Sequence, residues 1–65
     1  MKVRHVIRLI KADGWYQVRM RGSHRQFRHP EKRGLVTVAG HSGDELAIGT
    51  LSNIRRQAGL KKWDI

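Results

Sequence analysis

The fold of this chain is decided by residues 15–28, which read WYQVRMRGSHRQFR. The first half alternates apolar and polar side chains, the period-2 pattern of a half-buried strand. Gly22-Ser23 interrupts this alternation, and a second extended run follows from His24 to His29. A two-residue segment that contains Gly between two such runs is typical of a tight hairpin turn. The sequence therefore predicts two antiparallel strands, over residues 15–21 and 24–29.

The alternation also assigns a face of the hairpin to each side chain. We expect Tyr16, Val18 and Met20 to face the core on the first strand. On the second strand, Phe27 takes the core side together with Arg25. The opposite face then carries polar and cationic side chains, namely Gln17, Arg19, Arg21, His24, Gln26 and Arg28.

A helix and a third strand flank the hairpin. The helix is predicted from apolar residues at the i, i+3, i+4, i+7 spacing, and Asp13-Gly14 ends it. Those residues are Val3, Val6, Ile7 and Ile10. After a turn over residues 30–34, a third strand over 35–39 directs Val36 and Val38 to the core and Thr37 to the opposite face.

A second amphipathic helix closes the chain, with Leu51, Ile54 and Ala58 on its apolar side and Thr50 as its expected N-cap. The predicted fold class is α+β, in the order α-β-β-β-α. Both helices need apolar cover, so we expect both on one face of the three-stranded antiparallel sheet. The opposite face stays open. Residues 1–60 form a single domain in this interpretation, followed by a C-terminal tail over 61–65.

The size and the net charge of the chain limit the functions that it can have. The chain has 65 residues, with 14 Lys and Arg against 5 Asp and Glu, for a formal charge of +9. A domain this small cannot enclose a large substrate cavity, so any chemistry must take place on an open face. Basic faces usually bind nucleic-acid phosphate. A surface adapted only for solubility is the alternative that charge alone leaves open.

Several classes of site are not expected. The chain has no Cys, which excludes disulfides, thiolate metal sites and thiol nucleophiles. Its His residues are scattered and its acids do not cluster beside them, so we expect no required metal or other cofactor. The longest apolar run, over residues 46–48, is far shorter than the ~18–20 residues of a membrane span. The basic N-terminus lacks the apolar segment of a secretory signal, so we expect a cytoplasmic location without membrane association.

Short motifs between about Val3 and Leu60 follow one another in a distinctive order. They are Asp13-Gly14-Trp15-Tyr16, Gly22-Ser23-His24-Arg25-Gln26-Phe27, His29-Pro30, Val36-Thr37-Val38, Gly49-Thr50-Leu51 and Gln57-Ala58-Gly59-Leu60. Together they resemble the HicA family of toxin ribonucleases, and the motif over residues 22–27 is the most specific. The resemblance implies a fold similar to double-stranded-RNA-binding domains and an endoribonuclease activity on mRNA. It also implies neutralisation by a HicB-like antitoxin in a hetero-oligomeric complex.

The resemblance places the catalytic residue of this family at His24. Cleavage of RNA without a metal needs a base for the 2′-hydroxyl proton, and a histidine is the natural base near neutral pH. From the residues alone, a polar hairpin histidine without a catalytic role is the simpler interpretation, and the resemblance reverses that order. Guanidinium groups bind phosphates and stabilise developing charge. The residues expected to bind RNA are Arg19, Arg21, Ser23, Arg25 and Arg28.

The remaining candidates have less specific roles. We expect packing roles for Trp15 and for His29 at the edge of the core, and a loop position for His41, a weaker candidate for a second acid or base. Two other functions compete with the nuclease. One is a non-catalytic RNA-binding module of the same fold, which would need the basic face but not His24. The other is an interaction subunit whose charge serves an acidic protein partner.

Overall fold

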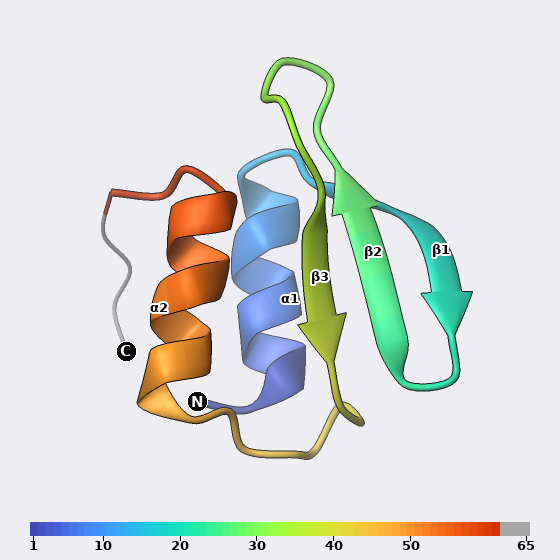
Figure 1. Cartoon of the computed structure of the whole chain (residues 1–65), viewed down its shortest axis with the longest axis vertical. Coiled ribbons are helices and arrows are strands. Elements are labelled where there is room, and N and C mark those ends of the chain that lie inside the picture. Colours follow the sequence, from blue (N-terminus) through green and yellow to red (C-terminus); the bar gives the residue numbers. More distant parts are fainter. Residues whose placement is uncertain (62–65) are drawn as a thin grey trace.

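A computed structural model describes residues 1–61 and has the predicted element order (Figure 1). The elements are α1 (Val3–Ala12), β1 (Tyr16–Arg21), β2 (His24–Arg28), β3 (Val36–Ala39) and α2 (Ile48–Gln57). The strands form one antiparallel sheet in the order β1-β2-β3. The α-β-β-β-α fold is thereby confirmed. Residues 62–65, most of the predicted tail, lie outside the described residues.

The core lies between the two helices and one face of the sheet. The apolar stripes of α1 and α2 are buried as the sequence predicts, except that Ile7 is half-buried against the core. The inward apolar residues of β2 and β3 are buried as well. Both helices contact β3 and cover the same side of the sheet (Figure 1). The buried side chains are Val3, Val6, Ile10, Trp15, Phe27, Val36, Val38, Leu51, Ile54 and Ala58.

The outer strand β1 departs from the sequence prediction. Tyr16, Val18 and Met20 are 50%, 45% and 51% exposed, so the prediction that they are part of the core is wrong. Met20 pairs with Arg25 and keeps its predicted helix side, but it is left uncovered there. One cause is coverage, because the helices lie against β2 and β3 while β1 forms the far edge of the sheet (Figure 1). The other cause is a β-bulge. The pairing register shifts between Gln17 and Arg19, so the alternation breaks at Val18.

The bulge exchanges two side chains between the faces of β1. Residues directly opposite one another in an antiparallel pair share a face. Gln17 is paired with the buried Phe27 and therefore lies on the helix side, where the sequence did not place it. Tyr16 is paired with Arg28 and lies on the open side. Beyond the bulge, the predicted faces of Arg19 and the residues that follow it hold.

The turn between β1 and β2 and the start of α2 test two further sequence predictions. Gly22 has φ 56° at the first position of the two-residue turn between β1 and β2, the conformation in which glycine is favoured. The predicted hairpin turn is confirmed. The N-cap prediction is wrong, because α2 already begins at Ile48 after Ala47 and without a side-chain cap. The Leu46 N–H donates to the Met1 carbonyl at 3.0 Å, which positions the chain before Thr50 is reached.

His29 joins the end of β2 to the end of α1. Its side chain is 6% exposed, and its Nδ1 accepts hydrogen bonds from the N–H groups of Glu31 and Lys32 at 3.0 and 3.1 Å. Nε2 therefore carries the proton and donates to the Asp13 carbonyl at 2.7 Å. The ring also packs edge-on against Trp15, with centroids 5.3 Å apart. The packing roles predicted for His29 and Trp15 are confirmed.

The same cluster reaches the end of α2. The Trp15 Nε1 donates to the carbonyl of Ala58 at 3.2 Å, and the Lys32 ammonium donates to that carbonyl at 3.1 Å. Lys32 also pairs with the Asp13 carboxylate at 2.6 Å. These bonds satisfy a carbonyl at the C-terminal end of α2 that would otherwise lack an intrahelical donor. They fix both helices relative to the connection between β2 and β3.

Candidate functional site

The side of the sheet that faces away from the helices carries the candidate site. We call it the open face. Strand register and the lining of a surface hollow place nine side chains there: Tyr16, Val18, Arg19, Arg21, His24, Gln26, Arg28, Leu35 and Thr37. None of them is acidic. The acids within residues 1–61 all lie outside the strands, at Asp13, Glu31, Asp44 and Glu45.

His24 is the first residue of β2 and follows the hairpin turn directly. It pairs with Arg21 on β1 and Ala39 on β3, and it is exposed. The histidine side-chain hydrogen bonds within residues 1–61 all belong to His29, so the His24 imidazole has no partner among them. Both ring nitrogens of His24 are therefore available to a bound molecule.

Three arginines accompany His24 on the open face. Arg21 lies directly opposite it, Arg19 lies opposite Gln26, and Arg28 is further along β2. The ion pairs within residues 1–61 involve Met1, His29 and Lys32 with acids elsewhere. The positive charge of the three guanidinium groups is therefore not neutralised by any described acid. Such a field attracts polyanions and weakens as salt rises.

The other two predicted RNA-binding residues have different positions. Arg25 pairs with the buried Val38 and so lies on the helix side, as the alternation predicts. Its Nη1 atom is buried and has no hydrogen-bond partner within the described chain. Ser23 is a half-buried turn residue next to His24. The structure therefore gathers His24 with Arg19, Arg21 and Arg28, while Arg25 stands apart from them.

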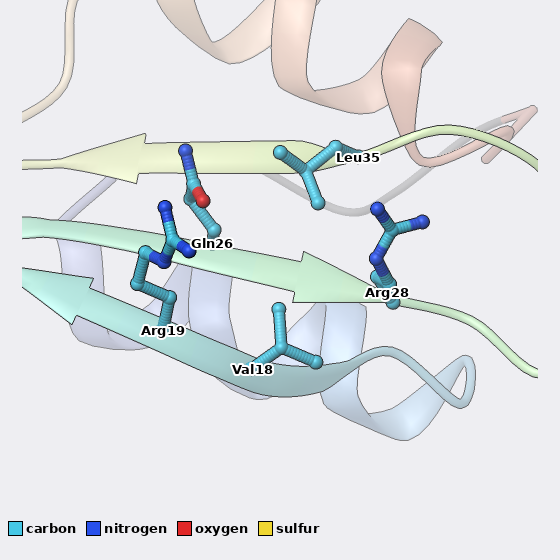
Figure 2. Close-up of a pocket in the computed structure, with 5 residues that line it drawn as sticks. All are labelled: Val18, Arg19, Gln26, Arg28 and Leu35. Atoms are coloured by element: carbon cyan, nitrogen blue, oxygen red, sulfur yellow. The ribbon is translucent and has the colours of Figure 1, made fainter.

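A hollow of about 520 Å³ indents the open face (Figure 2). It is lined by Val18, Arg19, Gln26, Arg28 and Leu35. Val18 and Arg19 contribute to the same face because the bulge places two successive residues opposite Gln26. Sequence reasoning missed the hollow because it assigned Val18 to the core. No local signal in the sequence marks the bulge that turns it outward.

His41 lies in the loop that follows β3, as predicted, and that loop is held near the hairpin turn. The Gly40 N–H donates to the Ser23 carbonyl at 3.1 Å. The His41 N–H donates to the Asp44 carboxylate at 2.9 Å, and the His41 side chain is exposed. The loop therefore borders the end of the sheet at which His24 begins β2.

Across residues 1–61, no three side chains of His, Asp or Glu come close enough together to hold a metal ion. Neither helix of the described chain has the length and apolar character needed to cross a bilayer.

The fold and the open face define a class: a small basic α+β domain with an uncovered cationic sheet. A family model described as the HicA toxin of bacterial toxin–antitoxin matches residues 3–60, nearly the whole chain. The chain belongs to the HicA toxin family and is a toxin of a toxin–antitoxin system. Membership implies an antitoxin partner in general terms. A comparison with curated proteins found no match.

Proposed function

We propose that this toxin is a metal-independent endoribonuclease that cleaves mRNA in the cytoplasm, with His24 as its general base. The observation that carries the proposal is the exposed His24 ring, which has no described partner and lies opposite Arg21 on a face without acids. A structural histidine such as His29 has its ring nitrogens engaged in hydrogen bonds. A general base needs a ring nitrogen that is free to accept a proton from the substrate, and the His24 ring meets this requirement.

The proposed step is an internal transfer within the RNA. A nitrogen of the His24 ring takes the proton of a ribose 2′-hydroxyl, and that oxygen attacks the adjacent phosphorus atom. The bond from phosphorus to the 5′-oxygen of the next nucleotide breaks, and this oxygen takes a proton from solvent. The products are a 2′,3′-cyclic phosphate and a 5′-hydroxyl.

Arg21 is the residue best placed to stabilise the reacting phosphate. Opposite residues on neighbouring antiparallel strands have Cβ atoms ~4.5–5.5 Å apart, so the Arg21 side chain reaches a phosphate that contacts His24. A guanidinium group donates paired hydrogen bonds to phosphate oxygens and offsets the charge that grows on them during attack. Arg19 and Arg28 extend this contact to the neighbouring phosphates.

The first test is His24→Ala, with His5→Ala, at an exposed histidine of α1, as the matched control that should cleave at the wild-type rate. General-base catalysis contributes ~10²–10⁴-fold, so the His24 variant should cleave a long unstructured RNA at least a hundredfold more slowly. The fold should be unchanged in circular dichroism, because an exposed side chain contributes little packing. An undiminished rate in His24→Ala would show that His24 is not the base. RNA binding by wild-type protein that never cleaves would favour the non-catalytic module.

A second test addresses the metal and the nucleophile. Cleavage should persist in excess EDTA, because the proposed step uses an imidazole and guanidinium groups. An oligonucleotide with a single 2′-methoxy group at the cut position should resist cleavage at that position, since the attacking oxygen is blocked. Mass spectrometry of the products of the unmodified substrate should find the 2′,3′-cyclic phosphate. Efficient cutting of the blocked substrate contradicts the mechanism.

We also propose that the antitoxin is HicB-like and inhibits by covering the open face in a hetero-oligomeric complex. The support is charge and position. The toxin carries +9, and its most concentrated uncompensated charge on the sheet lies beside His24. An acidic partner would be attracted to the same face that binds RNA.

A further inference from the structure

We propose that the hollow of the open face is a base-binding subsite that holds one adenine of single-stranded RNA, with Gln26 as its specificity-determining residue. The proposal rests on the proposed RNA function and adds a preference among bases to it. The hollow is lined by Val18, Arg19, Gln26, Arg28 and Leu35, and its volume of about 520 Å³ is within the usual range of small-ligand sites.

The two apolar side chains form the sides of the subsite. Val18 belongs to β1, and Leu35 is the residue just before β3. Gln26 lies on the central strand between them (Figure 2). Val18 is 45% exposed and Leu35 is 36% exposed, so both leave apolar surface in water. A planar base that settles between them removes part of that surface from water, which is favourable. The bulge at Val18 is what makes this arrangement possible.

Gln26 supplies the polar group that reads the base. Its amide offers a donor and an acceptor side by side, which matches the amino group and adjacent ring nitrogen that adenine and cytosine both present. The larger purine covers more of the apolar surface of Val18 and Leu35, which favours adenine. The side-chain hydrogen bonds within residues 1–61 use other groups, so the Gln26 amide has no partner among the described residues. The other side chains that line the hollow carry two guanidinium groups and two aliphatic groups.

The rim of the hollow connects the base to the RNA backbone. Arg19 lies directly opposite Gln26, and Arg28 lies two residues further along β2. His24 lies two residues from Gln26 in the other direction on the same face, a strand distance of about 7 Å. A base held at Gln26 therefore places a neighbouring phosphate within reach of His24. The absence of acids on this face favours an anionic occupant, and a planar base joined to phosphates fits a hollow whose rim carries two arginines.

The test uses the non-cleaving His24→Ala chain labelled with ¹⁵N and four tetraribonucleotides, each containing a single type of base. The tetra-adenylate should bind at least about fivefold more tightly than the tetra-uridylate, the low end for one bidentate contact. Backbone amides of residues 18, 19, 26 and 28 should shift in NMR spectra. Adding Gln26→Ala should abolish the preference and leave the salt dependence unchanged. Adding Thr37→Ala should preserve the preference, because Thr37 pairs with Gln26 on the open face but does not line the hollow.

The outcomes separate this proposal from the nuclease proposal. An adenylate preference that depends on Gln26 supports the subsite even if the wild-type chain never cleaves RNA. Equal affinity for the four oligonucleotides, or a preference that survives Gln26→Ala, overturns the subsite even if His24 proves to be the base. Shifts at residues 18, 26 and 28 that appear only with antitoxin would overturn it in favour of a protein-binding hollow.

Discussion

Two histidines near the ends of one strand show how single residues acquire different roles. His29 is buried, and both of its ring nitrogens are hydrogen-bonded to backbone groups of the connection and of α1. His24 is exposed at the other end of β2, and its ring has no partner among residues 1–61. The same side chain therefore holds the fold together at one end of β2 and is available for chemistry at the other.

The arginines of β1 and β2 allow a matched test of RNA contact. Arg19 and Arg25 are both in the hairpin, but Arg19 is on the open face and Arg25 is on the helix side. Binding of single-stranded RNA weakens with log salt at a slope of about −0.7 per neutralised phosphate. We predict that Arg19→Ala flattens this slope by about that amount and that Arg25→Ala changes it much less. Fluorescence anisotropy at several salt concentrations, on a His24→Ala background, measures both slopes.

An equal flattening in the two variants would contradict the division of charge between the two faces. The Arg25 side chain would then reach round the sheet edge to phosphate, and the RNA contact that the sequence predicts for it would be correct. A slope unchanged in both variants would place the phosphate contacts elsewhere on the molecule.

At the scale of elements, the connection from α1 to β1 tolerates substitution poorly. Gly14 has φ +109°, and a Cβ added there would lie 2.7 Å from the His29 Nε2. Gly22 has φ +56° in the hairpin turn, and an added Cβ would meet no atom within 4 Å. Both glycines adopt backbone conformations that L-residues avoid, but only Gly14 is also packed against a buried side chain.

We predict that Gly14→Ala lowers the free energy of unfolding more than Gly22→Ala does. The left-handed backbone alone costs a non-glycine residue ~1–2 kcal/mol, which both variants share. Gly14→Ala must in addition displace the His29 ring, which weakens its hydrogen bonds with the Asp13 carbonyl and with the N–H groups of Glu31 and Lys32, at ~0.5–1.5 kcal/mol each. Urea unfolding followed by circular dichroism measures the difference. A Gly22 variant that is the less stable of the two would contradict the importance of the His29 contacts.

At the scale of the whole molecule, charge and layering act together. The two helices cover only part of one side of the three-stranded sheet. They leave β1 and the entire opposite face exposed to water. The acids within residues 1–61 lie in connections and at element ends, so the uncovered face carries arginines and no described acid. The candidate site on the open face is therefore exposed to solvent in the described chain.

This arrangement predicts that antitoxin and RNA compete for the toxin. The His24→Ala chain should bind antitoxin and RNA separately, and added antitoxin should release a labelled RNA in anisotropy measurements. The toxin–antitoxin complex should weaken as salt rises, because opposite charges attract less strongly when screened. Thr50→Ala, on the exposed side of α2, is a control that should bind both partners normally. A stable ternary complex with unchanged RNA affinity would show that the antitoxin binds another surface.

The sequence by itself determined those features that depend on short-range spacing. The stripe of α1, the inward residues of β2 and β3 and the Gly22-Ser23 turn are correct because neighbouring residues alone set their periodicity and backbone preference. The resemblance of residues 22–27 then indicated the family and singled out His24 as a candidate residue. The match over residues 3–60 confirms the family.

Only the tertiary structure decided that the side chains of β1 are exposed on both faces of the sheet. It also decided where α2 begins. An apolar side chain is buried only if another layer covers it, and the helices do not extend over Tyr16, Val18 and Met20. The bulge at Val18 depends on the register with β2, a long-range pairing that alternation along one strand does not encode. The hollow around Gln26 is the product of both effects. It exists because an uncovered edge strand and a shifted register turn Val18 toward solvent beside Arg19.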